Sequence, residues 1–203
     1  MVDSITDKYI GDWKAGLITG KGTMIFTDGR RYEGNFFNNQ FEGKGTMIYK
    51  DGSKYSGDWK ADKCNGKGRL ELKKNNCVYE GDFVSNLWEG KGTLEWVEGS
   101  EWKGNKYIGD FKKGQRFGKG KYIYTNGDWY EGDFIDGLFS GEGTMSYKDG
   151  SKYIGAYKSG QRNGKGKYIS VNGTMQEGDF ENDKFLDPTK KEYGCVSGDC
   201  ENG

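Results

Sequence analysis

The stretch that decides the fold is residues 32–54, which read YEGNFFNNQFEGKGTMIYKDGSK. Variants of this stretch recur along the chain, and each begins with a tyrosine, any residue and a glycine. Seven such starts align with spacings of 23, 23, 24, 28, 23 and 23 residues, at Tyr9, Tyr32, Tyr55, Tyr79, Tyr107, Tyr130 and Tyr153. A regular period in this range indicates a repeat architecture. The seven units cover residues 9–175 of the 203-residue chain.

Positions within a unit are numbered here from its first tyrosine. In all seven units positions 3, 12 and 14 are glycine, position 5 is aromatic, and position 16 is a large side chain. The shared residues recur at every second position, which is typical of β-strands. Positions 20 and 21 are Asp-Gly or Asn-Gly in five units, which is a strong hairpin signal. The pattern predicts an all-β fold, a single-layer elongated ribbon of antiparallel β-hairpins.

The repeated glycines and charges predict two different faces. Glycine inside a strand weakens it, so three glycines per unit need a structural reason. We expect the rings of positions 1, 5 and 16 to lie over the glycines on a concave face. If positions 4 and 13 of a unit face each other on the opposite side, they form a charge ladder that fixes register. Its predicted pairs are Asp12–Lys21, Asp58–Lys67, Asp82–Lys91 and Asp110–Lys119, whereas unit 6 carries two acids, Asp133 and Glu142.

The composition argues against most kinds of chemistry. Lys plus Arg is 31 and Asp plus Glu is 31, so the basic excess that is usual for a nucleic-acid binder is missing. The chain has no histidine, which excludes Ser-His-Asp triads, Cys-His dyads and histidine metal sites. The Gly-Lys-Gly-Thr segments, as at residues 20–23, lack the spacing and the following helix of a P-loop. We therefore expect no enzyme activity, no cofactor and no metal site.

The cellular location is predicted from the apolar runs, the first residues and the cysteines. Apolar runs are too short for a membrane-spanning helix, and the first eight residues do not resemble a signal peptide. The four cysteines form no metal-binding pattern, which favours thiols in a reducing compartment, with a disulfide between Cys195 and Cys200 as the alternative. The expected location is cytoplasmic, with peripheral attachment to a membrane or the cytoskeleton as a variant.

The repeated pattern resembles the MORN (membrane occupation and recognition nexus) repeat family. The resemblance rests on Tyr-x-Gly-x-Trp/Phe, then Gly-x-Gly, then Asp/Asn-Gly, over all seven units. It implies an elongated hairpin ribbon with a grooved face that binds or scaffolds other proteins. It also implies that some members dimerise, and an older proposal has them bind phospholipid headgroups. No residue pattern carried over from the family is catalytic.

The candidate binding site is the aromatic groove. Apolar side chains also recur at position 10, near the expected hairpin tips, where polar residues are usual; they include Phe41, Trp88 and Phe139, with Phe117 one position later in unit 5. We expect a protein partner, a peptide or helix, to bind there. A homodimer and a tether to anionic phospholipid are the alternatives. The predicted groove residues are Trp13, Phe36, Phe41, Trp59, Phe83, Trp88, Phe111, Phe117, Phe134, Phe139 and Tyr157.

The ends and one junction depart from the repeat. Residues 1–8 are predicted to be an N-terminal cap, and residues 176–203 a degenerate repeat and C-terminal tail. Residues 196–203 align with a further repeat start, so we expect either a cap or a natural chain that continues. Five extra residues precede Tyr107, where Trp102-Lys-Gly imitates a repeat start. They predict either a bulge or lengthened turn, or a bend that places Trp102 on a protruding contact loop.

Overall fold

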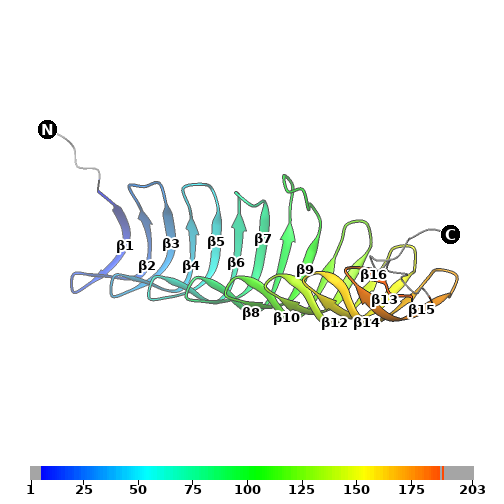
Figure 1. The fold of residues 1–203 in the computed structure, drawn as a ribbon. Helices are drawn as coiled ribbons and strands as arrows, with labels where there is room; N and C mark the ends of the chain where they lie inside the picture. The colour runs from blue at the N-terminus through cyan, green and yellow to red at the C-terminus, as the bar shows by residue number, and fades with distance from the viewer. Residues whose placement is uncertain (1–5, 188, 190–203) are drawn as a thin grey trace, which may run out of the picture.

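The fold is one open antiparallel sheet of sixteen strands in sequence order (Figure 1). This computed structural model describes residues 6–187 and residue 189. The seven repeats supply β1 to β14, two strands each, and the degenerate eighth start supplies β15 and β16. The predicted all-β hairpin ribbon is confirmed.

Every repeat contributes a first strand of seven or eight residues and a second of nine or ten. The bounds are β1 Lys8–Lys14, β2 Leu17–Ile25, β3 Arg31–Phe37, β4 Gln40–Ile48, β5 Lys54–Lys60, β6 Lys63–Leu72, β7 Cys77–Val84, β8 Leu87–Trp96, β9 Lys106–Lys112, β10 Gln115–Ile123, β11 Trp129–Ile135, β12 Leu138–Ser146, β13 Lys152–Lys158, β14 Gln161–Ile169, β15 Met175–Glu181 and β16 Lys184–Phe185.

Two kinds of turn alternate along the sheet. The tip inside each hairpin is a two-residue turn with positive φ at both residues, such as Asn38 (48°) and Asn39 (66°), which is a type I′ turn. The Asp-Gly pairs instead lie in the longer connections between units, where Gly29 has φ of 94° and its N–H donates to the Phe26 carbonyl at 3.0 Å. The tips were expected near position 10, whereas their turn residues lie at positions 7 and 8 of each unit.

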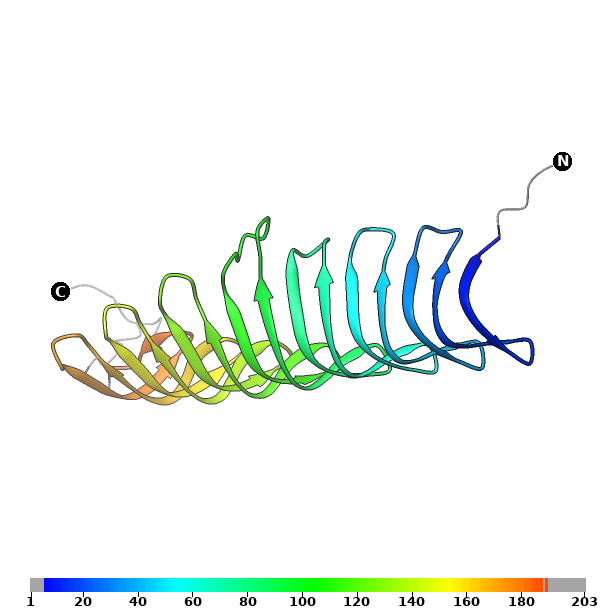
Figure 2. The ribbon, with the colours of Figure 1, turned by 180° about the vertical axis from the view of Figure 1, so that it is seen from behind.

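A bulge interrupts the pairing inside all seven repeat hairpins. In unit 3, Gly57 pairs with Gly68 and Trp59 with Cys64, so residues 65–67 lie opposite Asp58 alone. Bulges bend strands, and each strand here curves, so that the ribbon has the shape of a trough (Figure 2). The hairpin tips form one rim of this trough and the connections between units form the other (Figure 2).

The bulge also corrects the predicted position of one glycine column. A Cβ placed on Gly66, at position 12, would lie 2.9 Å from Cβ of Asp58 on the charged face, not under the rings. Gly66 has φ of 104°, a conformation that favours glycine. Position 12 is therefore glycine because of the bulge, and only positions 3 and 14 lie under rings.

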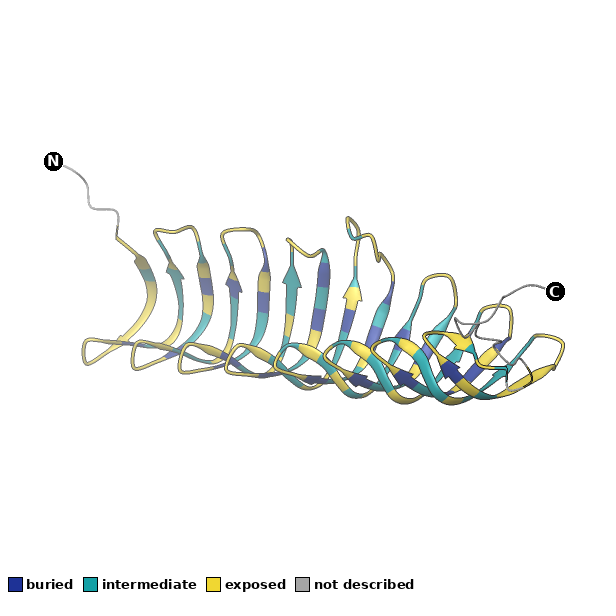
Figure 3. Ribbon diagram, viewed as in Figure 1, coloured by how far each residue is buried: buried dark blue, intermediate teal, exposed yellow. Residues whose placement is uncertain are grey.

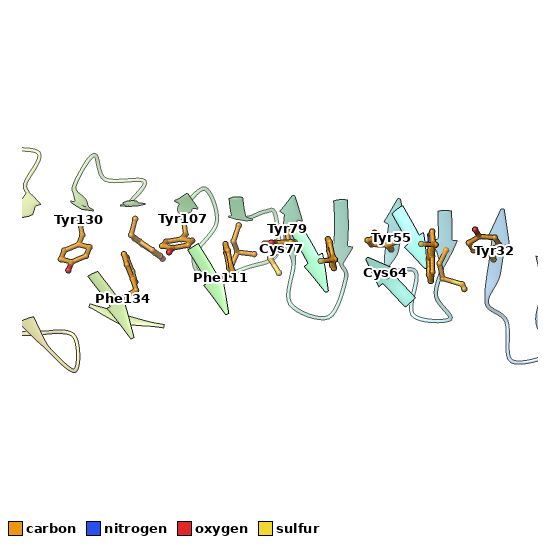
Figure 4. Close-up of a cluster of buried hydrophobic side chains, with 14 of the residues drawn as sticks. Tyr32, Tyr55, Cys64, Cys77, Tyr79, Tyr107, Phe111, Tyr130 and Phe134 are labelled. Carbon is orange, nitrogen blue, oxygen red and sulfur yellow. The ribbon is translucent and has the colours of Figure 1, made fainter. Parts of the chain in front are cut away.

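The core is a line of tyrosine rings on glycine pairs. Figure 3 shows the buried positions along the strands, and Figure 4 shows the rings. Tyr79 lies over Gly81 and Gly92, and a Cβ on Gly92 would be 2.5 Å from Cε2 of that ring. The tyrosine hydroxyl donates to the carbonyl of Asp82 at 2.9 Å. The expectation that rings lie over glycines is confirmed for the position-1 tyrosines, which lie over the glycines of positions 3 and 14. The same position-1 tyrosine is fully buried in six units, at Tyr32, Tyr55, Tyr79, Tyr107, Tyr130 and Tyr153.

The charge ladder joins neighbouring units and not the two strands of one unit. The predicted pairing within a unit is wrong because the bulge shifts the register there. Asp58 instead lies opposite Lys44 of the preceding unit, with Nζ and Oδ1 2.7 Å apart. The other carboxylate oxygen of Asp58 accepts the backbone N–H of Lys67 in its own bulge at 3.0 Å. Equivalent ladder pairs are Lys67–Asp82, Lys91–Asp110 and Lys119–Asp133.

The two acids of unit 6 fit this register. Asp133 pairs with Lys119, and Glu142 lies opposite Ala156. The series of four ion pairs therefore stops at unit 7, which carries Ala156 in place of the aspartate, although Lys165 and Asp179 lie opposite each other between the next two strands.

Candidate protein-binding groove

The aromatic face is the inside of the trough. A cavity of about 460 Å³ is lined by Asn39 and Asp62 from the tip rim, by Phe26 and Tyr49 from the connection rim, and by Phe41 between them. At the other end of the ribbon a second cavity, of about 900 Å³, is likewise lined by residues of both rims. We call this face, between the two rims, the inner groove.

Six of the predicted groove residues lie beneath the groove surface. These position-5 rings are at most 6 % exposed and pack edge-to-face between the tyrosines of adjacent units, so they form the core and not the binding surface. They are Phe36, Trp59, Phe83, Phe111, Phe134 and Tyr157. Trp13 has the same position but is 60 % exposed, because β1 is the edge strand of the described sheet and is paired on one side only.

Three predicted residues do line the inner groove. Phe41 stacks on Tyr32 with centroids 3.8 Å apart, and Phe139 stacks on Tyr130 at the same distance. Trp88 stacks on Tyr79 at 4.5 Å. All three are partly exposed and lie at position 10 of the even units, paired across the hairpin with position 5. Their contact with a partner stays a prediction.

Phe117 does not belong to the groove. Position 10 of unit 5 is Arg116, and the next residue, Phe117, points to the outer face, 37 % exposed beneath the ammonium group of Lys112. The assumption that Phe117 replaces a position-10 ring is wrong, because a shift by one residue moves a side chain to the other face. Position 10 in the odd units is Ile18, Cys64, Arg116 and Arg162.

The other wall of the groove was missed in the sequence. It is a column at position 18, two residues beyond position 16, and it continues the same period of two. The partly buried rings pack on the core, and burial raises the pKa of both Tyr49 and Tyr124 to about 12. The column consists of Phe26, Tyr49, Leu72, Trp96, Tyr124 and Tyr147.

The extra residues before Tyr107 lengthen one connection on this rim and leave the sheet regular. β8 and β9 keep the usual pairing, and the loop between them stands above its neighbours (Figure 1). Trp102 is 52 % exposed on that loop and touches Trp96 of the groove wall, with centroids 6.4 Å apart. Buried Asn105 donates to the hydroxyl of Tyr122 at 3.0 Å and accepts the N–H of Thr125. The segment is a lengthened turn that also exposes Trp102.

The outer face is electrostatically balanced over its central part. The four ladder lysines pair with aspartates at 2.6–2.7 Å. The ammonium of Lys44 lowers the pKa of the Asp58 carboxyl, and the N–H of Lys67 adds to this effect. These lysines line a shallow outer groove whose floor is backbone at glycines such as Gly68 and Gly92. Their charges are therefore largely compensated.

The described residues offer no metal cluster: among residues 6–187 no three Cys, Asp or Glu side chains are placed to hold an ion. The same part of the chain contains no helix long and apolar enough to cross a membrane. Cys64 and Cys77 are free and buried, and burial raises the pKa of the Cys64 thiol to about 12, which makes it a poor nucleophile. Cys195 and Cys200, as well as most of the predicted cap and tail, lie outside the described residues.

The curved, one-layer ribbon of tandem hairpins defines a β-repeat protein. The family model described as MORN repeat matches residues 9–30, 32–54, 55–77, 79–101, 107–129, 130–152 and 153–175. The chain therefore belongs to the MORN repeat family, as the residue pattern predicted.

Comparison with solved structures gives, among others, two matches that cover most of this chain. One is the SAS-4 (dCPAP) TCP domain of Drosophila melanogaster in complex with a proline-rich motif of Ana2 (dSTIL). It has a TM-score of 0.52 and 12 % identity, and the match covers 89 % of this chain and 94 % of that chain. The other is the TCP10 domain of Danio rerio CPAP in complex with a STIL peptide, with a TM-score of 0.30, 10 % identity and coverage of 85 % and 100 %. At this identity the first similarity concerns the fold alone.

Proposed function

We propose that this protein is a non-enzymatic interaction module that binds a polypeptide segment of a partner along its inner groove. The observation that carries the proposal is the strip of partly exposed rings along positions 10 and 18, which no described element covers. A single-layer sheet has no second layer to cover such a strip. A concave apolar surface with polar rims is the usual form of a peptide or helix site.

Two further points favour a polypeptide over a lipid surface. The lysines that would attract anionic headgroups are paired with aspartates on the outer face, which reduces their field. The SAS-4 TCP domain, which has a similar fold, is in complex with a proline-rich motif of another protein. The groove here crosses many strands, about 10 Å per repeat, so a segment of twelve residues would cover two to four repeats.

The test is selection of peptides from a phage-displayed library of random twelve-residue sequences, followed by measurement of Kd for the winners. The groove variant carries Phe41→Ile, Trp88→Ile and Phe139→Ile, because Ile18 shows that the repeat accepts isoleucine at position 10. We expect the parent to enrich related peptides and this variant to bind them at least about tenfold more weakly.

The matched control changes the same three units on the opposite face. It carries Phe37→Lys, Val84→Lys and Ile135→Lys; all three positions are exposed, and the odd units carry lysine there. We expect this control to bind as the parent does. The proposal is overturned if the control loses binding while the groove variant keeps it. It is also overturned if the parent enriches no peptide, whether or not it binds vesicles of phosphatidylserine and phosphatidylcholine.

A further inference from the structure

One cation lies among the rings of the inner groove. Arg116 occupies position 10 of unit 5, where the units on either side carry Trp88 and Phe139. Its guanidinium carbon lies 5.2 Å from the ring centroid of Tyr122, 5.8 Å from that of Tyr107, and 5.9 Å from those of Trp96 and Phe134. The side chain is only partly exposed, and burial lowers the pKa of the guanidinium, which nevertheless stays charged.

No carboxylate balances this charge within the described residues. No Asp or Glu oxygen of residues 6–187 lies within 4.0 Å of the Arg116 nitrogens. Nη2 of Arg116 instead donates a hydrogen bond to the carbonyl of Gly137 at 2.6 Å. Arg162 has the equivalent place in unit 7, and there Nε lies 3.3 Å from Oδ1 of Asp183. Asp183 and Gly137 hold the same turn position, each in the tip of the hairpin that follows the arginine's own unit. The fold thus has a place for a carboxylate beside position 10, and glycine leaves it open at Arg116.

The irregular connection adjoins the same point of the groove. Trp96 is the last residue of β8 before that connection, and it packs on Tyr122 with centroids 5.7 Å apart. Asn105, within it, donates a hydrogen bond to the Tyr122 hydroxyl. The extra residues of the fourth junction therefore support the ring that faces Arg116. Two departures from the repeat, the arginine and the insertion, meet at one place.

We propose that Arg116 is where the inner groove binds an Asp or Glu carboxylate of the partner segment; this inference rests on the proposed function. A carboxylate accepts paired hydrogen bonds from guanidinium, and it would neutralise a charge that is held in an apolar groove. A phosphate is disfavoured, because phosphate sites gather several cationic groups and the surroundings of Arg116 are aromatic.

The geometry also predicts what surrounds the acidic residue. Trp88 and Phe139 lie one repeat away on either side of Arg116, about 10 Å each. Apolar partner residues that reach them would stand about three residues from the acid in an extended segment, and about seven in a helix. The expected partner is therefore an apolar segment with a single central acid.

The experiment repeats the library selection on the parent, Arg116→Met and Arg162→Met. We expect the parent to enrich Asp or Glu at one position between apolar residues. Arg116→Met should still select apolar peptides but lose the acidic preference, and Arg162→Met should keep it because Asp183 already pairs with Arg162. On a selected peptide, Glu→Gln should weaken binding to the parent about tenfold and to Arg116→Met less than about twofold.

A third variant keeps the test valid if Arg116→Met misfolds. Gly137→Asp places an acid at the turn position where Asp62 and Asp183 already occur with positive φ. We expect this variant to fold and its new aspartate to pair with Arg116. It should bind the acidic peptide more weakly than the parent does, and bind the Gln form of the peptide as the parent does. An acidic preference that is missing in the parent, or that persists in Arg116→Met, overturns the proposal. If no variant enriches any peptide, groove binding itself has failed.

Discussion

The two faces of this sheet share the same strands and differ in almost every other respect. On the inner face the central tyrosines are fully buried, and each contacts rings of its own unit and the next edge-to-face, as Tyr79 does with Phe83 and Phe111. On the outer face the ladder pairs join lysines about 70 % exposed to aspartates about 30 % exposed. Buried rings contribute far more free energy than exposed ion pairs, so the inner face stabilises the ribbon.

The outer face instead sets how successive strands pair. Each ladder aspartate connects two units, because one oxygen pairs with a lysine of the preceding unit and the other accepts a bulge N–H of its own unit. A strand that slipped by one residue would lose both contacts. The comparison leads to four predictions.

The largest effect is expected at alkaline pH. Burial raises the pKa of several tyrosines above the usual value of about 10, to about 12 for Tyr49 and Tyr124. Because the folded-state pKa is the higher one, this stabilisation is complete below about pH 10 and is lost as pH rises through the folded-state pKa. We expect the whole sheet to unfold between about pH 10 and 12, with tyrosinate absorbance and far-UV circular dichroism changing together. Tyrosine ionisation near pH 10 in an intact sheet would contradict this prediction.

Crowding the inner face should have the next largest effect. In Gly92→Ala the new methyl group would lie 2.5 Å from the buried Tyr79 ring, which has no room to move. We expect a loss of about 3 kcal/mol in the free energy of unfolding, measured with urea. Gly160→Asn is the control, because its tip position is open and Asn39 and Asn86 occupy it elsewhere. If Gly160→Asn lowers the free energy of unfolding by more than about 0.5 kcal/mol, the loss of a glycine alone destabilises the ribbon.

Removal of one ladder aspartate should cost less. We expect Asp58→Ala to lower the free energy of unfolding by about 1–2 kcal/mol at neutral pH, because Lys44 loses its partner and the Lys67 N–H loses its acceptor. The folded-state pKa of Asp58 is lowered, so its contribution is present above about pH 4 and is lost as pH falls through that folded-state pKa. Urea unfolding against pH should show the parent and variant converge in acid; a constant difference would refute the assignment.

Extension of the ladder should have the smallest effect. Glu142 faces Ala156 where the series of ion pairs stops, so Glu142→Lys combined with Ala156→Asp would add a fifth pair. A double-mutant cycle should give a coupling of about 0.5 kcal/mol in favour of the pair. The coupling should vanish near 1 M salt, where the Debye length is only about 3 Å. A coupling of zero at low salt would mean that the ladder does not stabilise the ribbon.

Much of the architecture could be predicted because the same residue pattern occurs in all seven units. Tyr-x-Gly and Gly-x-Gly placed rings over the position 3 and 14 glycines, and this is what Tyr79 does with Gly81 and Gly92. The groove surface was less accessible to prediction. Positions 5 and 10 of the even units are both aromatic, and the packing between units decides their burial. Phe36 is buried between Tyr9 and Tyr32, whereas Phe41 stacks on Tyr32 and stays partly exposed.

The sequence by itself determined the strands, their number per repeat, the two unlike faces and the family, because these depend on a period of two and on residue types at fixed spacing. Only the tertiary structure decided which aspartate meets which lysine, and that Arg116 lies among rings without a carboxylate. The physical reason is the bulge in each hairpin. It changes the pairing inside each of the seven repeat hairpins by two residues, and the strand period of two does not reveal that change.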